Sequence, residues 1–259
     1  MNRLHAFAPE RNAAQGLVIS IAQSREDVRC AQQLRHRVFV EEMGARLGAQ
    51  GNGVERDGFD PFCEHLIVRE GRSGEVIGTY RLLTPERAQR AGTFIAEREF
   101  ALEALAPLRP HLAELGRACI DRRYRNGATI MLLWSGIARY VKARGIRYLF
   151  GCASIASDDG GLNASAVYAR LIADHLAPAE YRVVPRKPFA LCDVPANTLS
   201  RVPALLKGYL RAGAWICGAP AWDPEFETVD LLVLLPLARV EARYARHFLG
   251  EAVTGARSY

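Results

Sequence analysis

The chain has 259 residues, of which 49% are apolar and 24% charged, ordinary values for a globular protein of one large or two small domains. No uninterrupted apolar run reaches the roughly 18 residues that a membrane span needs. The net charge of +6 suits an acidic partner such as a nucleic acid, anionic lipid headgroups or an acidic carrier protein. No nucleic-acid-binding motif accompanies that charge, so nucleic acid is not expected as a partner.

The six cysteines are scattered, with no CxxC pair and no Cys/His cluster. This spacing predicts neither a metal site nor a disulfide framework, and it is typical of a reducing cytoplasm. The N-terminus is charged and lacks the apolar core of a signal peptide. We therefore expect a flexible leader over 1–16, one domain over 17–250 and a tail over 251–259.

In the first third of the chain, the apolar, β-branched residues 17–22 predict a strand. Ser24 is a candidate N-cap for a helix whose apolar residues recur at helical spacing as far as the sequence "RHRVFVEEMG". Residues 44–60 are rich in Gly and acids and predict a loop. The runs 65–70 and 76–83 flank "GRSGE", which is a hairpin signature.

The middle of the chain predicts a helix around 101–108 and then a strand over 112–121. Gly116 lies inside that strand, where glycine often marks a bulge or a close backbone approach. A polar Gly turn leads into a long helix whose core face carries Ile130, Leu133, Trp134, Ile137 and Val141. Residues 146–155 follow as a buried strand.

The C-terminal third predicts a helix over 163–176, a helix that Gly213 stops, a strand over 228–237 and a final helix over 240–248. This order of elements predicts an α/β (α+β) protein with a mixed central sheet flanked by helices and a C-terminal α/β extension.

The turn "RRYRNGA" before the long helix is a candidate phosphate site. A helix N-terminus presents free N–H groups, and Arg122, Arg123 and Arg125 add positive charge. The turn matches neither the P-loop nor the Rossmann pattern. The alternative is an Arg-rich turn that only caps a helix.

The strand–turn–helix–strand unit around this turn resembles motif A of the GNAT acyltransferase superfamily. Arg123, Gly127 and Ala128 match its Q/R-x-x-G-x-G/A signature loosely, as R-x-x-x-G-A. The resemblance implies that Arg123, Arg125, Gly127 and Ala128 hold the phosphate of a pantetheine arm. It also implies that the thioester lies against a splayed pair of strands, one of them bulged.

Four blocks, "RHRVFVEEMG", "ERDGFD", "GTYRLL" and "ELGRACI", resemble in order the R-x-x-V-F, E-x-D-x-F/Y-D, L/Y-R and E-x-x-R blocks of acyl-homoserine lactone synthases. Those enzymes have the GNAT fold. The resemblance implies a charged cluster beside the substrate cleft, formed by Arg37, Asp57, Asp60, Arg81, Glu114 and Arg117.

The C-terminal block "LLKGYLRAGAWICGAPAWDPEFETVDLLVLLPL" differs from those synthases, and with two earlier blocks it is similar to the L-ornithine N-acyltransferases. That resemblance covers nearly the whole chain. It implies transfer of a 3-hydroxyacyl group from acyl carrier protein to the α-amine of L-ornithine, giving lyso-ornithine lipid. It implies no tightly bound cofactor and no metal, and a cytoplasmic enzyme in peripheral contact with anionic membrane.

Within this resemblance Glu114 is the expected general base, and Arg117 is the second expected catalytic residue. Arg37, Arg81 and Arg117 would position carboxylates, because arginine binds them in a bidentate manner. Asp57 and Asp60 would either bind the amine substrate or organise the loop in an internal ion-pair network. A bulged strand around Gly116 would supply N–H groups to the oxyanion.

Several further side chains have two interpretations each. Tyr168 either protonates the leaving thiol or is a half-buried core aromatic. Lys207, Arg211 and Asp230 either contact carrier protein or substrate or, for the first two, lie on a solvated helix face. The aromatic residues Phe39, Phe62 and Trp134 either line an acyl tunnel or pack in the core.

Two other functions fit the sequence. One is an N-acyltransferase that uses another amine, such as a different amino acid or an S-adenosylmethionine-like donor. The other is a non-catalytic basic module that binds a membrane surface or nucleic acid and does not consume thioester.

Overall fold

The computed structural model describes residues 10–12, 16–46 and 52–240. In these residues nine strands form one sheet in the order β1-β2-β3-β4-β6-β7-β11-β10, with β9 paired to β11. Every strand pair is antiparallel except β6 with β7. The strands are β1 (Glu10–Asn12), β2 (Leu17–Ile21), β3 (Glu64–Glu70), β4 (Val76–Leu83), β6 (Leu112–Ile120), β7 (Tyr148–Ala156), β9 (Trp215–Ile216), β10 (Ala221–Asp223) and β11 (Thr228–Pro236).

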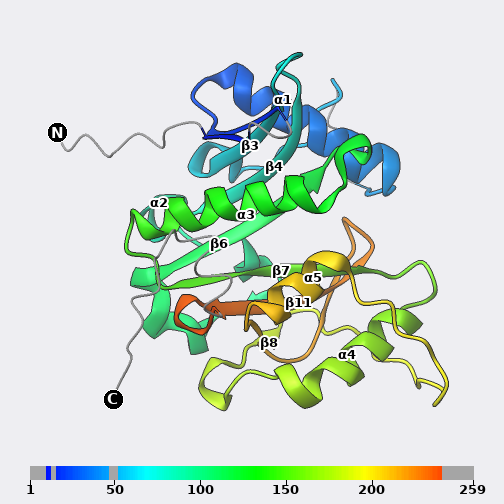
Figure 1. Cartoon of the computed structure of the whole chain (residues 1–259). Coiled ribbons are helices and arrows are strands. Elements are labelled where there is room, and N and C mark those ends of the chain that lie inside the picture. Colours follow the sequence, from blue (N-terminus) through cyan, green and yellow to red (C-terminus); the bar gives the residue numbers. More distant parts are fainter. Residues whose placement is uncertain (1–9, 13–15, 47–51, 241–259) are drawn as a thin grey trace, which may run out of the picture.

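Helices cover both faces of this sheet (Figure 1). They are α1 (Arg25–Arg35), α2 (Pro85–Ala91), α3 (Gly127–Lys142), α4 (Leu162–His175) and α5 (Ala204–Arg211). A π-helical segment, η1 (His36–Glu42), continues α1. Short 3-10 segments join the rest: η2 (Asp60–Phe62), η3 (Ile95–Arg98), η4 (Glu103–His111), η5 (Arg122–Tyr124), η6 (Ala179–Tyr181) and η7 (Leu237–Arg239). A small second sheet pairs β5 (Phe100–Ala101) with β8 (Val184–Pro185).

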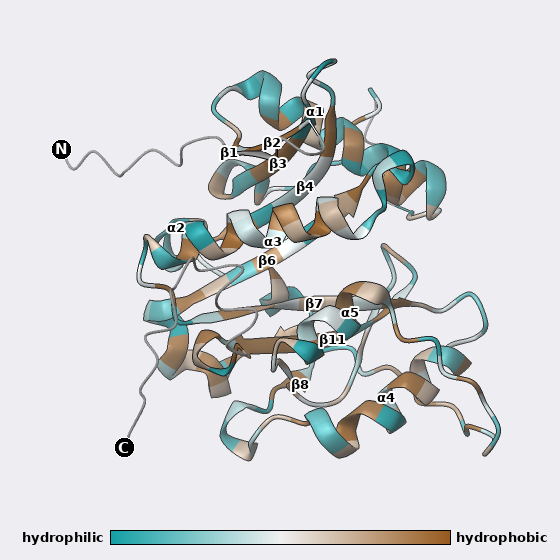
Figure 2. Cartoon of the chain, in the orientation of Figure 1, coloured by the Kyte–Doolittle hydropathy of each residue, from teal (hydrophilic) through white to brown (hydrophobic). Residues whose placement is uncertain are grey.

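The apolar core lies on both faces of the sheet. The α3 helix packs its stripe against β2, β3 and β4. The α1 helix packs against the other face, on β3, β4 and β6, where its Leu34 lies in one cluster with Ile67 of β3. The α4 and α5 helices cover one face of β7 and β11, and η3 and η4 belong to the cluster on these strands that contains Phe150 and Leu232. Figure 2 shows β11 as apolar along almost its whole length. No described helix is both long and apolar enough to cross a membrane.

Most expected elements are confirmed, and two in the middle of the chain differ from expectation. Ser24 caps α1 as expected, with the reciprocal bonds of a capping box through Asp27. The segment expected as a helix over 101–108 is instead the 3-10 segment η4, because Pro107 and Pro110 remove the N–H groups that an α-helix needs. The sequence analysis did not predict α2, although Pro85 at its first position is a helix-start signal.

Two expectations concern the chain ends. Residues Glu10–Asn12, inside the stretch expected as a leader, form β1 on β2. The helix expected over 240–248 lies outside the described residues except for its first position.

The parallel pair β6–β7 is short for the length of its strands. Its register runs only from Leu112–Tyr148 to Glu114–Phe150, after which the strands diverge. On its other edge β6 bulges against β4, since two residues of β6, Arg117 and Ala118, face Tyr80 alone. The backbone of Arg117 is left-handed there, with φ at 51°. The splayed and bulged strand pair that the GNAT resemblance implies is therefore present.

Gly151 is the first residue of β7 beyond its pairing with β6, which ends at Phe150. A Cβ at this residue would lie 2.2 Å from the carbonyl oxygen of Leu115, so a side chain would push the diverging strands apart. The absence of a side chain at Gly151 sets how closely the two backbones approach.

We expect Gly151→Ala to lower the free energy of unfolding by about 2–3 kcal/mol, because the contact is with backbone that cannot rotate away. The matched control is Gly116→Ala, since a Cβ at Gly116 meets nothing within 4 Å. Urea unfolding followed by circular dichroism measures both variants. Equal stability of the two variants would contradict the close-approach argument.

Candidate active site

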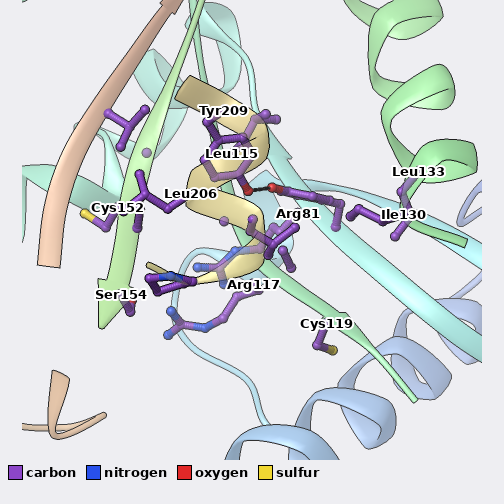
Figure 3. A pocket seen from close by; sticks show the side chains of 18 of the residues that line it. Arg81, Leu115, Arg117, Cys119, Ile130, Leu133, Cys152, Ser154, Leu206 and Tyr209 are labelled. Atoms are coloured by element: carbon purple, nitrogen blue, oxygen red, sulfur yellow. Dashed lines mark hydrogen bonds between the residues drawn. The ribbon is translucent and has the colours of Figure 1, made fainter. Parts of the chain in front are cut away.

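A cavity of about 730 Å³ opens where β6 and β7 diverge. Its walls come from β6, β7 and β11, from α3 and η1, and from α5, which lies over it. Figure 3 shows Leu206 and Tyr209 reaching in from α5, Ile130 and Leu133 from α3, and Cys152 and Ser154 from β7. The lining is mostly apolar, with a few arginines and acids at defined places.

A network of three acids and three arginines closes one side of the cavity. Arg35 lies between Glu55 and Asp60, at 2.5 and 2.8 Å. Arg81 binds Asp57 at 2.8 Å and lies 3.5 Å from Asp60. Arg117 completes the network, with Glu55 at 3.1 Å and Asp57 at 3.5 Å. The three acids belong to the loop over 52–63, the Gly-broken loop, and through these ion pairs they hold α1, β4 and β6 together.

Exposure rises along this network toward the cavity. The Arg35 side chain is 0% exposed, whereas that of Arg117 is 20% exposed. Burial alone raises the pKa of Asp57, but the charges of Arg81 and Arg117 outweigh it, so this pKa lies below its usual value. Arg117 also stacks on Phe226, with its Cζ 4.5 Å from the ring centroid. The inner pairs are structural in position. Arg81 and Arg117 both line the cavity, and Arg117 is the more exposed of the two.

Arg37 is not part of this network. Its side chain is 41% exposed and lies 3.5 Å from Glu75 and 3.8 Å from Asp121. The place expected for Arg37 belongs to Arg35, because residues two apart in a helix point to nearly opposite sides. The sequence signal was available, since the R-x-x-V-F spacing ending at Val38 and Phe39 begins at Arg35. Glu55, the first acid of "ERDGFD", was likewise missed as a cluster member.

Glu114 lies at the base of the cavity and is the last residue of β6 that pairs with β7. Its two carboxylate oxygens accept hydrogen bonds from the backbone N–H groups of Ile95 and Ala96, at 2.6 and 2.8 Å. Burial raises the pKa of Glu114 to about 7, against the lowering effect of those two bonds. Each oxygen retains a second lone pair. The carboxyl group therefore changes its charge near neutral pH beside the point where the strands part.

The turn before α3 reaches the other end of the cavity through Arg125, Asn126 and Gly127. Asn126 caps α3 by accepting from the N–H of Thr129. Arg125 binds Glu42 at 2.5 Å. The exposed Arg123 binds Asp121 at 2.9 Å and Glu75 at 2.8 Å, while Ala128, in the first turn of α3, is absent from the lining. Arg123 and Arg125 are therefore both held at the turn by carboxylates.

A second group of acids lines the cavity and takes no part in the ion pairs of the arginine network. Glu99 follows η3 and Asp230 lies on β11, and with the thiol of Cys152 their ligand atoms are all within 4.8 Å of one another. All three line the cavity. The sequence analysis named Asp230 only as a candidate contact and did not single out Glu99, because the two are distant in sequence and neither belongs to a motif.

The remaining candidates divide between cavity and core. Phe39 and Trp134 line the cavity, whereas Phe62 packs in the core cluster below the sheet. Tyr168 packs against the α4–α5 cluster and is not among the lining residues. Lys207 and Arg211 are exposed on α5.

A tyrosine pair was missed. Tyr80 of β4 and Tyr209 of α5 join their hydroxyl groups across the cavity, as the dashed line in Figure 3 marks. Burial raises the pKa of both phenols, so both stay protonated at neutral pH. This contact fastens α5 over the cavity.

Comparison with known proteins decides the family. A family profile described as acetyltransferase (GNAT) domain matches residues 34–135. An L-ornithine N(alpha)-acyltransferase of Brucella abortus is 34% identical over 91% of this chain and 90% of its own length. One of Rhizobium meliloti is 34% identical over 90% and 84%, respectively. The chain belongs to the L-ornithine N(alpha)-acyltransferase family.

Solved structures agree on the fold of this GNAT-like family member. The acyl-homoserine lactone synthase LasI is 15% identical, with a TM-score of 0.51, and the match covers 93% of this chain and 98% of that one. The CoA-dependent synthase BjaI, solved with SAM and isopentyl-CoA, is 18% identical, also with a TM-score of 0.51, over 85% and 79%. At these identities the likeness concerns the fold alone.

We expect Arg35→Met to lower the free energy of unfolding by about 3–5 kcal/mol, because it leaves Glu55 and Asp60 buried without their cation. Arg37→Met, two residues away and in exposed pairs, is expected to lower it by less than about 1 kcal/mol. Guanidinium unfolding of the two variants checks this. If the Arg37 variant lost as much stability as the Arg35 variant, the assignment of the network would be wrong.

Proposed function

We propose that the chain transfers a 3-hydroxyacyl group from acyl carrier protein to the α-amine of L-ornithine, forming lyso-ornithine lipid. The observation that carries the proposal is the cavity at the β6–β7 divergence, which combines an apolar interior with charged walls. An acyl chain needs the first and an amino acid needs the second. Family membership supports the choice of ornithine as acceptor.

The acyl donor would enter between the diverging strands. The α3 N-terminus and its turn, with Arg123, Arg125, Gly127 and Ala128, would receive the pantetheine phosphate. For that, the arginines must exchange their present carboxylate partners for the phosphate. The apolar residues of α3 and α5 would line the path of the acyl chain.

Transfer would proceed directly through a tetrahedral intermediate. The α-amine nitrogen loses a proton and attacks the thioester carbonyl, and the carbon–sulfur bond then breaks, with the thiolate taking up a proton. Glu114 would accept the amine proton, directly or through a water molecule. Arg117 would bind the α-carboxylate, because it is the more exposed of the two network arginines that line the cavity. N–H groups of the β6 bulge would stabilise the oxyanion.

The role of Glu114 can be tested by the pH dependence of turnover. A general base acts when deprotonated, so kcat/KM for ornithine should rise with pH through about 7, the pKa of Glu114. Arg81 and Glu97 also face this carboxyl and act on its pKa in opposite directions. Glu114→Gln should lower kcat by about 100-fold or more and remove this step from the profile.

Free-thiol release from 3-hydroxypalmitoyl-acyl carrier protein, with and without ornithine, is the assay. Glu103→Gln, an exposed acid on η4, is the matched control. A Glu114→Gln enzyme that retained rate and profile would leave Glu114 only as the anchor of η3.

The donor can be tested by offering the same 3-hydroxyacyl group on acyl carrier protein and on coenzyme A. The net charge of +6 favours an acidic carrier, and the same charge would hold the enzyme against anionic membrane at the inner face. We expect a higher kcat/KM with the carrier, and an advantage that shrinks as salt rises from 50 to 300 mM. Equal rates at all salt concentrations would argue against carrier docking.

A further inference from the structure

The second group of acids, Glu99 and Asp230, differs from every other acid of the cavity in its partners. Glu114 accepts hydrogen bonds from two backbone N–H groups. Asp223 likewise accepts hydrogen bonds from the backbone N–H groups of Glu225 and Phe226, at 2.8 and 3.2 Å. Asp230, 3% exposed, accepts hydrogen bonds from the neutral hydroxyls of Thr228 and Ser154, at 2.7 and 3.2 Å, and its other side-chain partner is Glu99 itself. The Oε2 atom of Glu99 is buried with no hydrogen-bond partner.

The pair also has no ion-pair partner in the part of the chain that the structure describes. Among the described residues the ion pairs of the cavity join Arg81 and Arg117 to the loop acids, and none includes Glu99 or Asp230. Two carboxyl groups this close cannot both ionise easily in a buried site. Burial and the neighbouring Asp230 raise the pKa of Glu99 to about 9, and burial raises that of Asp230 to about 6. A cation from outside the chain would relieve both effects.

The position of the pair suits the second amine of a diamino acid. The Glu99–Asp230 group includes Cys152 of β7. Cys152 lies two residues beyond Phe150, where the pairing of β7 with β6 ends. Two residues of a strand span about 7 Å. The two nitrogens of extended ornithine lie about 6 Å apart by standard bond lengths. An α-amine placed at the divergence would therefore bring the side-chain ammonium to this group.

We propose that Glu99 and Asp230 bind the side-chain ammonium of the ornithine substrate and select it over amino acids that lack this charge. The inference rests on the proposed function and assigns a recognition site within it. The sequence resemblance gave the substrate-binding acids as Asp57 and Asp60. The structure commits both of those to arginines, with Asp60 only 7% exposed.

A metal ion is the other cation that three such groups could attract. Zinc and similar ions bind the thiolate of cysteine, not the thiol. Burial and the charge of Glu99 raise the pKa of Cys152 well above its usual value, so the thiol would have to lose its proton before it could bind such an ion. The ammonium of a substrate needs only the two carboxyl groups, and the observations favour it.

The test compares L-ornithine with L-norvaline, which has the same carbon chain without the side-chain amine. Wild-type enzyme should prefer ornithine in kcat/KM by about 100-fold. Glu99→Gln and Asp230→Asn should each lower kcat/KM for ornithine by about 30-fold or more, mainly through KM, and leave norvaline nearly unchanged. The ratio of the two substrates is insensitive to partial misfolding, because misfolded enzyme uses neither. Glu103→Gln is again the control, with an unchanged ratio.

The outcomes separate this inference from the proposed function. Ornithine acylation with an unchanged ornithine-to-norvaline ratio in both variants would overturn the recognition site and leave the function standing. Loss of wild-type activity with a chelator, restored by zinc, would also overturn it in favour of a metal. A wild type that acylates other amino acids but not ornithine would remove the proposed function and the site together. Collapse of the ratio in both variants, with the melting temperature within a few degrees, would support the site.

Discussion

The site depends on one constraint, the early end of the parallel pairing between β6 and β7. Only three residue pairs join the strands. Beyond them each backbone has a paired strand on its outer edge only, β4 for β6 and β11 for β7. The bulge at Arg117 increases the local twist of β6, and the missing side chain at Gly151 lets the backbones meet closely before they part. The cavity, its apolar walls and its unpaired backbone groups all follow from this divergence.

The Gly-broken loop over 52–63 holds the bulged strand β6 in place through Arg117. Its acids lie between arginines of α1, β4 and β6, so a single loop ties together three elements that are far apart in the sequence. Such buried pairs are weak evidence for stability, since desolvation opposes the attraction. They fix geometry well, however, because removing either partner leaves a buried charge. The left-handed backbone of Arg117 is tolerated where two carboxylates and Phe226 hold its side chain.

The sequence predicted the fold well because its signals were local. Helical spacing in α3, the hairpin of β3 and β4 and the capping box of Ser24 each depend on residues close in the chain, and the structure contains all of them. The family resemblance, which whole-chain relatives confirm, added the bulge and the splayed strands. The misplacement of Arg37 was avoidable, because the R-x-x-V-F spacing begins at Arg35 and the helix directs the two arginines to different sides.

Residues that meet only in three dimensions were beyond such reasoning. Glu99 and Asp230 are separated by more than half the chain, and Tyr80 and Tyr209 come from a strand and a helix with no shared motif. No periodicity links such positions, because the contact is produced by β11 inserting beside β7 and by α5 crossing the cavity. The sequence therefore grouped the acids that belong to a motif and did not bring together those that tertiary structure assembles.

The two sets of carboxylates in one cavity differ in a way that bears on catalysis. Acids already paired with arginine gain little from a substrate cation, because binding it would break existing contacts. Acids that are bonded only to hydroxyl groups or to each other, such as Asp230, gain a full ion pair when a substrate cation binds. An enzyme that must deprotonate one ammonium of a diamine while leaving the other protonated needs this division. The side-chain nitrogen would stay charged between carboxylates, and the α-nitrogen would lose its proton near Glu114, where arginines disfavour a second positive charge.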